Sequence, residues 1–483
     1  MSSDAQPRSL SDALSSLPAV YGGDLRSLIR TKINNTGDSI PLLVVLDDDP
    51  TGTQTCHDIN VLTQWDVSLL SSTFTSDLTT KTRGFFILTN SRALHPPEAK
   101  SLIAEICNNL LAASKATGTD FEVVLRSDST LRGHFPLEAE VSESALDRKA
   151  DCWILAPFFL QGGRYTIDDV HYVAEGDKLV PAGQTPFAQD ASFGYKSSNL
   201  RDWVVEKSRG SINANNVKAL SLTDIRSGGP DEICKQLLSF SKGSVVVVNA
   251  AAEEDMDVVV LGILEAASRG RRFLYRSGAA LVSARLGIKP IPPKSADALH
   301  LDKNVGGLII AGSYVPKTTA QLKALREKAG DKLTTIELQV DELLESETSA
   351  NSAVSQAIHQ AEGEIQKGQD VLVMTSRKLI TGKDERESLN IGGVIARNLV
   401  RFLQELKTRP RYVIAKGGIT SSDMATKGLK MRRATVIGQA APGVPLWECF
   451  EDTSKWAGIP YIVFPGNVGS EDTLFEVVRG WQA

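Results

Sequence analysis

Short apolar runs separated by stretches of helical spacing recur through the first half of the chain, and this alternation constrains the fold most strongly. Each run has the length of a strand that is buried on both faces of a sheet. Successive strands that are linked by helices lie parallel to one another. The sequence therefore predicts an α/β fold with mostly parallel sheets. The expected strands are residues 42–46, 84–89, 121–125, 152–156 and 245–249.

Polar side chains follow the first three of these runs. Because the carboxyl ends of parallel strands meet at one edge of a sheet, where ligands bind, we expect these side chains to share one rim. Arginine pairs with carboxylates in a bidentate manner, and aspartate accepts hydrogen bonds from hydroxyls. The rim thus suits an anionic, polyhydroxylated small molecule. The rim consists of residues 47–49, 89–92 and 126–129.

The first rim segment places three aspartates, residues 47–49, directly after a strand and before Pro50. Adjacent carboxylates repel one another and are costly to bury unless a metal, a cation or hydroxyl donors meet them. We expect Asp48 and Asp49 to be catalytic, one accepting a proton from the substrate hydroxyl and the other holding Mg²⁺. The alternatives are a solvated acidic turn, or a structural ion network in which Arg92 and Arg126 neutralise the acids.

A proline-rich stretch divides the chain. We expect a tail and a helix at residues 1–38, a substrate domain at 39–289, a linker at 290–305 and a second α/β domain at 306–483. The ligand cleft would lie between the two domains. In the second domain, three small-residue or glycine turns follow apolar runs, and such turns let the backbone approach a polyphosphate. A further Gly-Gly pair at 392–393 is expected to precede a helix that extends to residue 406.

Composition excludes several classes of protein. The 53 basic and 58 acidic residues leave a net charge of −5, which disfavours nucleic-acid binding. No apolar stretch is long enough to span a membrane. The five cysteines are scattered without CxxC spacing, which argues against disulfides and zinc and for the cytoplasm.

Seven segments in order, DDDPTG, NSR, SDSTLRG, QGGRYT, GSYVPKTTAQ, KGGITSSD and PGNVG, resemble the four-carbon acid sugar kinase family. The resemblance covers nearly the whole chain from residue 41. It implies that an N-terminal domain binds a small sugar acid such as threonate, and that a C-terminal domain binds ATP with Mg²⁺ for phosphoryl transfer to a hydroxyl. The substrate contacts that it implies are Asp48, Arg92, Arg126, Ser127, Asp128 and Ser129. The nucleotide contacts that it implies are Ser313, Gly417, Gly418, Ile419, Thr420, Gly466, Asn467 and Gly469.

The chain also departs from the family pattern. It has DDDPTG where ADDFTG is common, and GGIT where GGET is common, so it resembles a divergent subgroup whose substrate need not be threonate. Two other functions stay open. Asp47 and Asp49 match the nucleophile motif of haloacid-dehalogenase-like phosphatases, and the altered GGIT turn would suit a sensor that binds both ligands without turnover. A homodimer is left open as the assembly.

Overall fold

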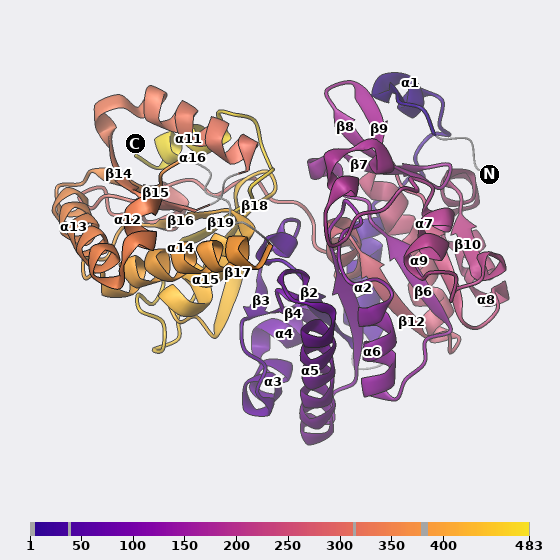
Figure 1. The fold of residues 1–483 in the computed structure, drawn as a ribbon. Helices are drawn as coiled ribbons and strands as arrows, with labels where there is room; N and C mark the ends of the chain where they lie inside the picture. The colour runs from indigo at the N-terminus through magenta and orange to yellow at the C-terminus, as the bar shows by residue number, and fades with distance from the viewer. Residues whose placement is uncertain (1–4, 37–39, 313–314, 378–384, 483) are drawn as a thin grey trace. The chain divides into compact units, whose positions relative to one another are not determined.

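The computed structural model describes residues 5–36, 40–312, 315–377 and 385–482. The chain divides into two compact units, Met1–Pro290 and Ile291–Ala483. Each unit contains a mostly parallel sheet with helices packed against it (Figure 1). The predicted α/β class is therefore confirmed.

The sheet of the first unit has the strand order β10-β11-β6-β12-β5-β2-β4-β3, and every neighbouring pair is parallel. All five predicted strands are present in it. Their apolar residues are buried on both faces, as a parallel sheet covered by helices requires. The strands are β2 (Leu42–Asp47), β3 (Ile59–Leu62), β4 (Gly84–Leu88), β5 (Phe121–Arg126), β6 (Cys152–Ala156), β10 (Val217–Leu220), β11 (Ser244–Val248) and β12 (Phe273–Ser277).

Helices connect these strands and bury one face against the sheet. A single core cluster joins alternate residues of β2, β4 and β5 to the inner faces of α3, α5 and α6. Capping residues mark several starts: Asp66 accepts from the backbone of Leu69 before α3, and Pro96 opens α5. The helices are α2 (Leu25–Thr36), α3 (Val67–Phe74), α4 (Asp77–Thr82), α5 (Pro96–Thr117), α6 (Leu137–Leu146), α7 (Leu200–Lys207), α8 (Gly229–Ser239), α9 (Glu253–Ser268) and α10 (Ala279–Arg285).

A second, small antiparallel sheet in this unit has the order β1-β9-β8-β7. The glycines of the QGGRYT segment form a turn that leads directly into β7. The N-terminal strand β1 pairs with β9 ahead of the short helix α1, so residues 8–15 are not a loose tail. The elements are β1 (Arg8–Ser9), α1 (Leu10–Ser15), β7 (Arg164–Ile167), β8 (Val170–Glu175) and β9 (Lys178–Pro181).

The second unit has the strand order β17-β18-β19-β16-β13-β15-β14. Strand β18 is antiparallel to both neighbours, and the other pairs are parallel. The strands are β13 (Leu308–Ala311), β14 (Leu333–Leu338), β15 (Asp370–Thr375), β16 (Val413–Lys416), β17 (Arg433–Ala441), β18 (Val444–Glu448) and β19 (Tyr461–Phe464).

One prediction for this unit is wrong. Gly392 and Gly393 lie inside helix α14 and do not form a turn before it. No atom outside its own helix lies within 4 Å of a Cβ built at Gly392, and a mid-helix glycine costs only about 1 kcal/mol. The helix therefore forms in spite of the two glycines, because the amphipathic residues around them favour it. The helices are α11 (Pro316–Ala329), α12 (Val340–Glu345), α13 (Glu347–Gln366), α14 (Glu385–Glu405), α15 (Gly418–Asp423) and α16 (Thr473–Gln482).

No helix among the described residues is both long and apolar enough to cross a membrane.

Candidate functional site

The parallel register brings the predicted rim together at the carboxyl edge of the first sheet. Asp47 lies opposite Arg126 on β5, and Arg126 lies opposite Ser277 on β12. The backbone N–H of Thr89 donates to the Asp47 carbonyl at 2.9 Å, and that of Asp48 donates to the Arg126 carbonyl at 3.1 Å. Segments distant in sequence are thus fixed side by side by sheet hydrogen bonds.

The acidic turn is buried. Asp47 is 1% exposed and Asp48 is 4% exposed, so the alternative of a solvated turn is wrong. Asp49 caps the short helix at Pro50–Thr53 by accepting from the backbone N–H of Thr51 at 2.9 Å and from its hydroxyl at 2.6 Å. The turn therefore holds its carboxylates in fixed and different surroundings.

These surroundings separate the three pKa values. Burial raises the pKa of Asp47 well above its usual value, and Arg126 only partly opposes this. Burial also raises the pKa of Asp48. For Asp49 burial acts in the same direction, but Arg92 and the hydrogen bonds from Thr51 outweigh it and lower the pKa. Asp49 is consequently the acid held most firmly in its ionised form.

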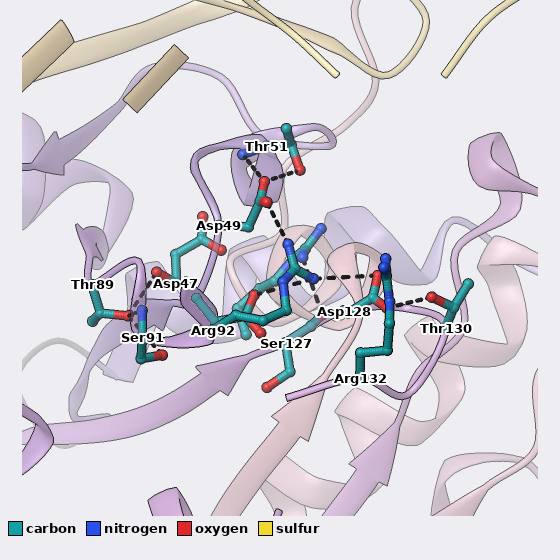
Figure 2. A network of polar contacts seen from close by, with 12 residues as sticks. Asp47, Asp49, Thr51, Thr89, Ser91, Arg92, Ser127, Asp128, Thr130 and Arg132 are labelled. Atoms are coloured by element: carbon teal, nitrogen blue, oxygen red, sulfur yellow. Dashed lines mark hydrogen bonds and ion pairs between the residues drawn. The ribbon is translucent and has the colours of Figure 1, made fainter. Parts of the chain in front are cut away.

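Arg92 is the centre of the ion network, as Figure 2 shows. Its guanidinium is bonded to Asp49, lies 3.4 Å from Asp128 and lies 3.9 Å from Asp48. Burial disfavours the charged guanidinium, but the three carboxylates raise the pKa of Arg92 overall. The predicted substrate residue Arg92 is thus surrounded by acids of the protein itself.

The loop after β5 is fixed from two directions. Asp128 accepts from Arg132 Nε at 2.7 Å, and its pKa is lowered because Arg132 and Arg92 outweigh burial. The carbonyl of Ser129 accepts from His171 Nε2 at 2.7 Å. Burial lowers the pKa of His171 to about 4, so this histidine is a neutral structural donor near neutral pH.

Arg126 takes a different position from Arg92. Its Nη1 donates to the Ser127 carbonyl at 3.0 Å and its Nη2 to Gln54 Oε1 at 3.2 Å. Its Nε is buried and has no hydrogen-bond partner among the described residues. Arg126 therefore supports the loop and the residues that follow the acidic turn.

Four further charged residues lie at this site, Arg132, Glu138, Arg164 and Arg276, of which Arg132 and Arg164 fall within the SDSTLRG and QGGRYT segments. Burial and the nearby Asp48 raise the pKa of Glu138 to about 7. Arg276 donates to the carbonyl of Arg132 at 3.0 Å. Arg132 could have been found within the SDSTLRG segment. Glu138 gives no sequence signal, because it begins a helix whose inward face is visible only in the folded chain.

The predicted nucleotide turns gather at the carboxyl edge of the second sheet. Strands β16 and β19 are parallel neighbours, and the Gly417 N–H donates to the Phe464 carbonyl at 2.9 Å. Gly417 has a φ of +108°, which favours glycine. Thr318 donates to the Gly466 carbonyl at 3.2 Å, so the start of α11 joins the same group. Ser313 lies outside the described residues.

Lys416 ties two of these turns together. It is fully buried, its Nζ donates to the Pro465 carbonyl, and it lies 4.5 Å from the centroid of the Phe464 ring. Burial, together with the positive charge of the nearby Lys317, lowers the pKa of Lys416 to about 7. In contrast, Ile419 of the GGIT turn is 68% exposed.

The acidic turn fits part of a magnesium shell. Among the described residues no three His, Cys, Asp or Glu side chains converge as a metal site. Nevertheless, Oδ1 of Asp47 and both side-chain oxygens of Asp48 are buried without a hydrogen-bond partner there. Protein sites for Mg²⁺ often supply only one or two carboxylates and leave the rest of the shell to phosphates and water.

Comparisons with known proteins agree with this division of sites. A family model described as a sugar-binding N-terminal domain matches residues 43–285, and one described as a nucleotide-binding C-terminal domain matches residues 308–474. Together they define a two-domain, kinase-like protein that binds a sugar and a nucleotide. The chain belongs to the four-carbon acid sugar kinase family.

Solved structures share the fold at low sequence identity. Haemophilus influenzae protein HI1011 aligns with a TM-score of 0.60 and 18% identity over 92% of this chain and 100% of that chain. A Salmonella typhimurium LT2 protein described as a putative tRNA synthase aligns with a TM-score of 0.65 and 15% identity over 90% and 98%. A search of curated protein sequences found no significant match.

Proposed function

We propose that this protein is an ATP-dependent kinase that phosphorylates a hydroxyl of a small, four-carbon-type sugar acid. The observation that carries the proposal is the buried Asp48 carboxylate in the sugar-binding domain. Neither of its oxygens has a hydrogen-bond donor within the described part of the chain. A buried acceptor without a donor is costly, and a substrate hydroxyl would supply that donor.

The reaction assigns different tasks to the two acids. As the substrate hydroxyl oxygen bonds to the γ-phosphorus, the bond from phosphorus to the ADP oxygen breaks and the hydroxyl proton passes to Asp48. The raised pKa of Asp48 favours accepting that proton. Asp49, held by Arg92, stays ionised and keeps the guanidinium in place. Bound Mg²⁺ would neutralise charge on the phosphates.

The proposed domain roles follow the two family models. Residues 39–289 would bind the acid through Asp48, Arg92 and the loop at 126–129, and residues 306–483 would bind ATP. The glycine turns support the second role because their backbone N–H groups can approach phosphates closely. The proposed nucleotide contacts are Ser313, Gly417, Gly418, Ile419, Thr420, Gly466, Asn467 and Gly469. The five cysteines, all free and buried, favour the cytoplasm.

The geometry of Asp47 argues against the phosphatase alternative. That mechanism requires an accessible, ionised aspartate that attacks phosphorus. Asp47 is instead 1% exposed, and burial raises its pKa well above the usual value. Asp47 is therefore a poor nucleophile.

The test is to incubate the full-length protein with ATP, Mg²⁺ and a panel of four- to six-carbon aldonic and oxo-acids. Mass spectrometry should detect ADP and a phosphorylated acid. Inorganic phosphate released from sugar phosphates without ATP would instead establish a phosphatase. Binding of both ligands with no product would establish a sensor.

A further inference from the structure

Arg132 and Arg164 share one aromatic ring. Their guanidinium carbons lie 5.2 Å and 5.5 Å from the centroid of Phe187. Burial lowers the pKa of Arg164, the Asp128 carboxylate opposes this, and the positive charge of Arg132 adds to it. Two guanidiniums therefore lie against one ring, beside the loop that carries Asp128.

Arg164 makes its hydrogen bond and its ring contact within the described part of the chain with uncharged groups. Its Nη1 donates to the Gly162 carbonyl, and its Nε is buried without a hydrogen-bond partner among the described residues. No carboxylate of the described chain lies within ion-pair distance of it. Arg132, in contrast, is bonded to Asp128 and lies 3.7 Å from Asp190. A partly buried guanidinium that forms no ion pair, on the same ring as a second one, favours an anion at this position.

The other arginines of the site are already engaged. Arg92 is surrounded by three carboxylates, which leaves it little attraction for a fourth. Arg126 donates to Ser127 and Gln54. Arg276 donates to backbone carbonyls and lies 5.0 Å from the ring centroid of Trp203, so it is built into the core. Arg126 and Arg276 likewise form no ion pair among the described residues, but they are 3% and 6% exposed, whereas Arg164 is only partly buried and is therefore more open to a ligand.

We propose that Arg164, with Arg132 beside it, binds the carboxylate of the sugar acid. This assignment rests on the proposed function and extends it. It places the carboxylate away from Asp48, so that a hydroxyl and not the carboxylate faces the acid. Arg92 then holds the aspartates next to the bound acid, and Arg126 supports the loop after β5.

The backbone turn before Arg164 fixes the position of this residue. Arg164 begins β7 directly after a turn in which Gly163 has a φ of +72°. A Cβ at Gly162 would collide with the Phe159 ring, so the turn admits no larger residue there without rearrangement. A guanidinium fixed in this way loses little freedom when it forms two parallel hydrogen bonds to a carboxylate.

The test compares Arg164→Met and Arg164→Lys with wild type in the full-length protein. Calorimetric titrations use threonate and erythronate, with threitol and erythritol as counterparts that lack the carboxylate. Arg272→Met is the matched control, because Arg272 is exposed and precedes β12 at the amino end of the parallel sheet, opposite the edge that carries Asp48. Circular dichroism checks that each variant is folded.

We expect Arg164→Met to bind the acids ~10- to 100-fold more weakly, the usual effect of losing a charged hydrogen bond. Affinity for the two alditols should not change, and Arg164→Lys should lie between. In turnover, the loss should appear in KM for the acid more than in kcat.

Two results would overturn the assignment alone: unchanged acid affinity in Arg164→Met, or an equal loss for acids and alditols. In both cases the wild-type protein would still phosphorylate an acid. If wild-type protein neither binds nor phosphorylates the four-carbon acids, the proposed function fails, and the assignment fails with it.

Discussion

The carboxylate of Asp47 occupies the space where a Cβ at position 52 would stand. Both residues are buried, and the helical turn at Pro50–Thr53 folds Gly52 back over the end of β2. Position 52 therefore requires glycine, because a side chain there would collide with the Asp47 carboxylate.

Gly52→Ala should displace the Asp47 carboxylate and destabilise the first unit by about 1–3 kcal/mol, the usual cost of overpacking a buried site. Urea unfolding measures this. Gly22→Ala is the control, because a Cβ at Gly22 meets no atom within 4 Å. Equal stability of the two variants would show that the turn can relax without cost.

Asp48→Asn should lower kcat by ~10²- to 10⁴-fold with little change in KM, because it removes the proton acceptor and keeps the shape. Asp49→Asn should act differently, since it releases Arg92 and disturbs the cap on Thr51. Steady-state kinetics with Mg²⁺ saturating measure both. If both variants retain nearly full kcat, the acidic turn is structural and the base lies elsewhere.

Glu138 should make stability depend on pH. Its pKa is raised from 4.5 to about 7 by burial, so between these values the folded chain binds more protons than the unfolded chain. Stability from this group therefore falls as pH rises through that window, and the cost is complete above pH 7. Glu138→Gln should remove this cost. Its free energy of unfolding relative to wild type should therefore be higher at pH 8 than at pH 4.5, by on the order of 1–3 kcal/mol. Unfolding of the exposed-site variant Glu140→Gln should show no such difference.

Lys416 should have the opposite effect on stability: in a higher pH range, stability should rise as pH rises. Its pKa is lowered from 10.5 to about 7, so in that window the unfolded chain binds more protons and stability rises with pH. Lys416→Met should flatten this rise between pH 7 and pH 9.5, as measured by urea unfolding. The exposed-site variant Lys303→Met should keep it. A wild-type slope in Lys416→Met would mean that Lys416 is charged in the folded protein.

Local pattern was enough to predict five of the eight described strands of the first sheet and the edge at which polar residues meet. Residues 152–156 form β6 with the predicted bounds, because a short, continuous apolar run has few other ways to be buried. The same reasoning failed at Gly392 and Gly393, where the amphipathic pattern of a long helix outweighs a glycine pair.

The sequence by itself determined which chemical groups follow each strand: the aspartates after β2, Arg92 after β4 and Asp128 after β5. Only the tertiary structure decided which of them pair. Arg92 was expected to meet the substrate and is enclosed by three aspartates, whereas Arg164, known from the sequence only as part of the QGGRYT segment, forms no ion pair among the described residues. The physical reason is that ion pairing depends on distances across the fold, and these distances come from sheet register and helix packing, which no local spacing encodes.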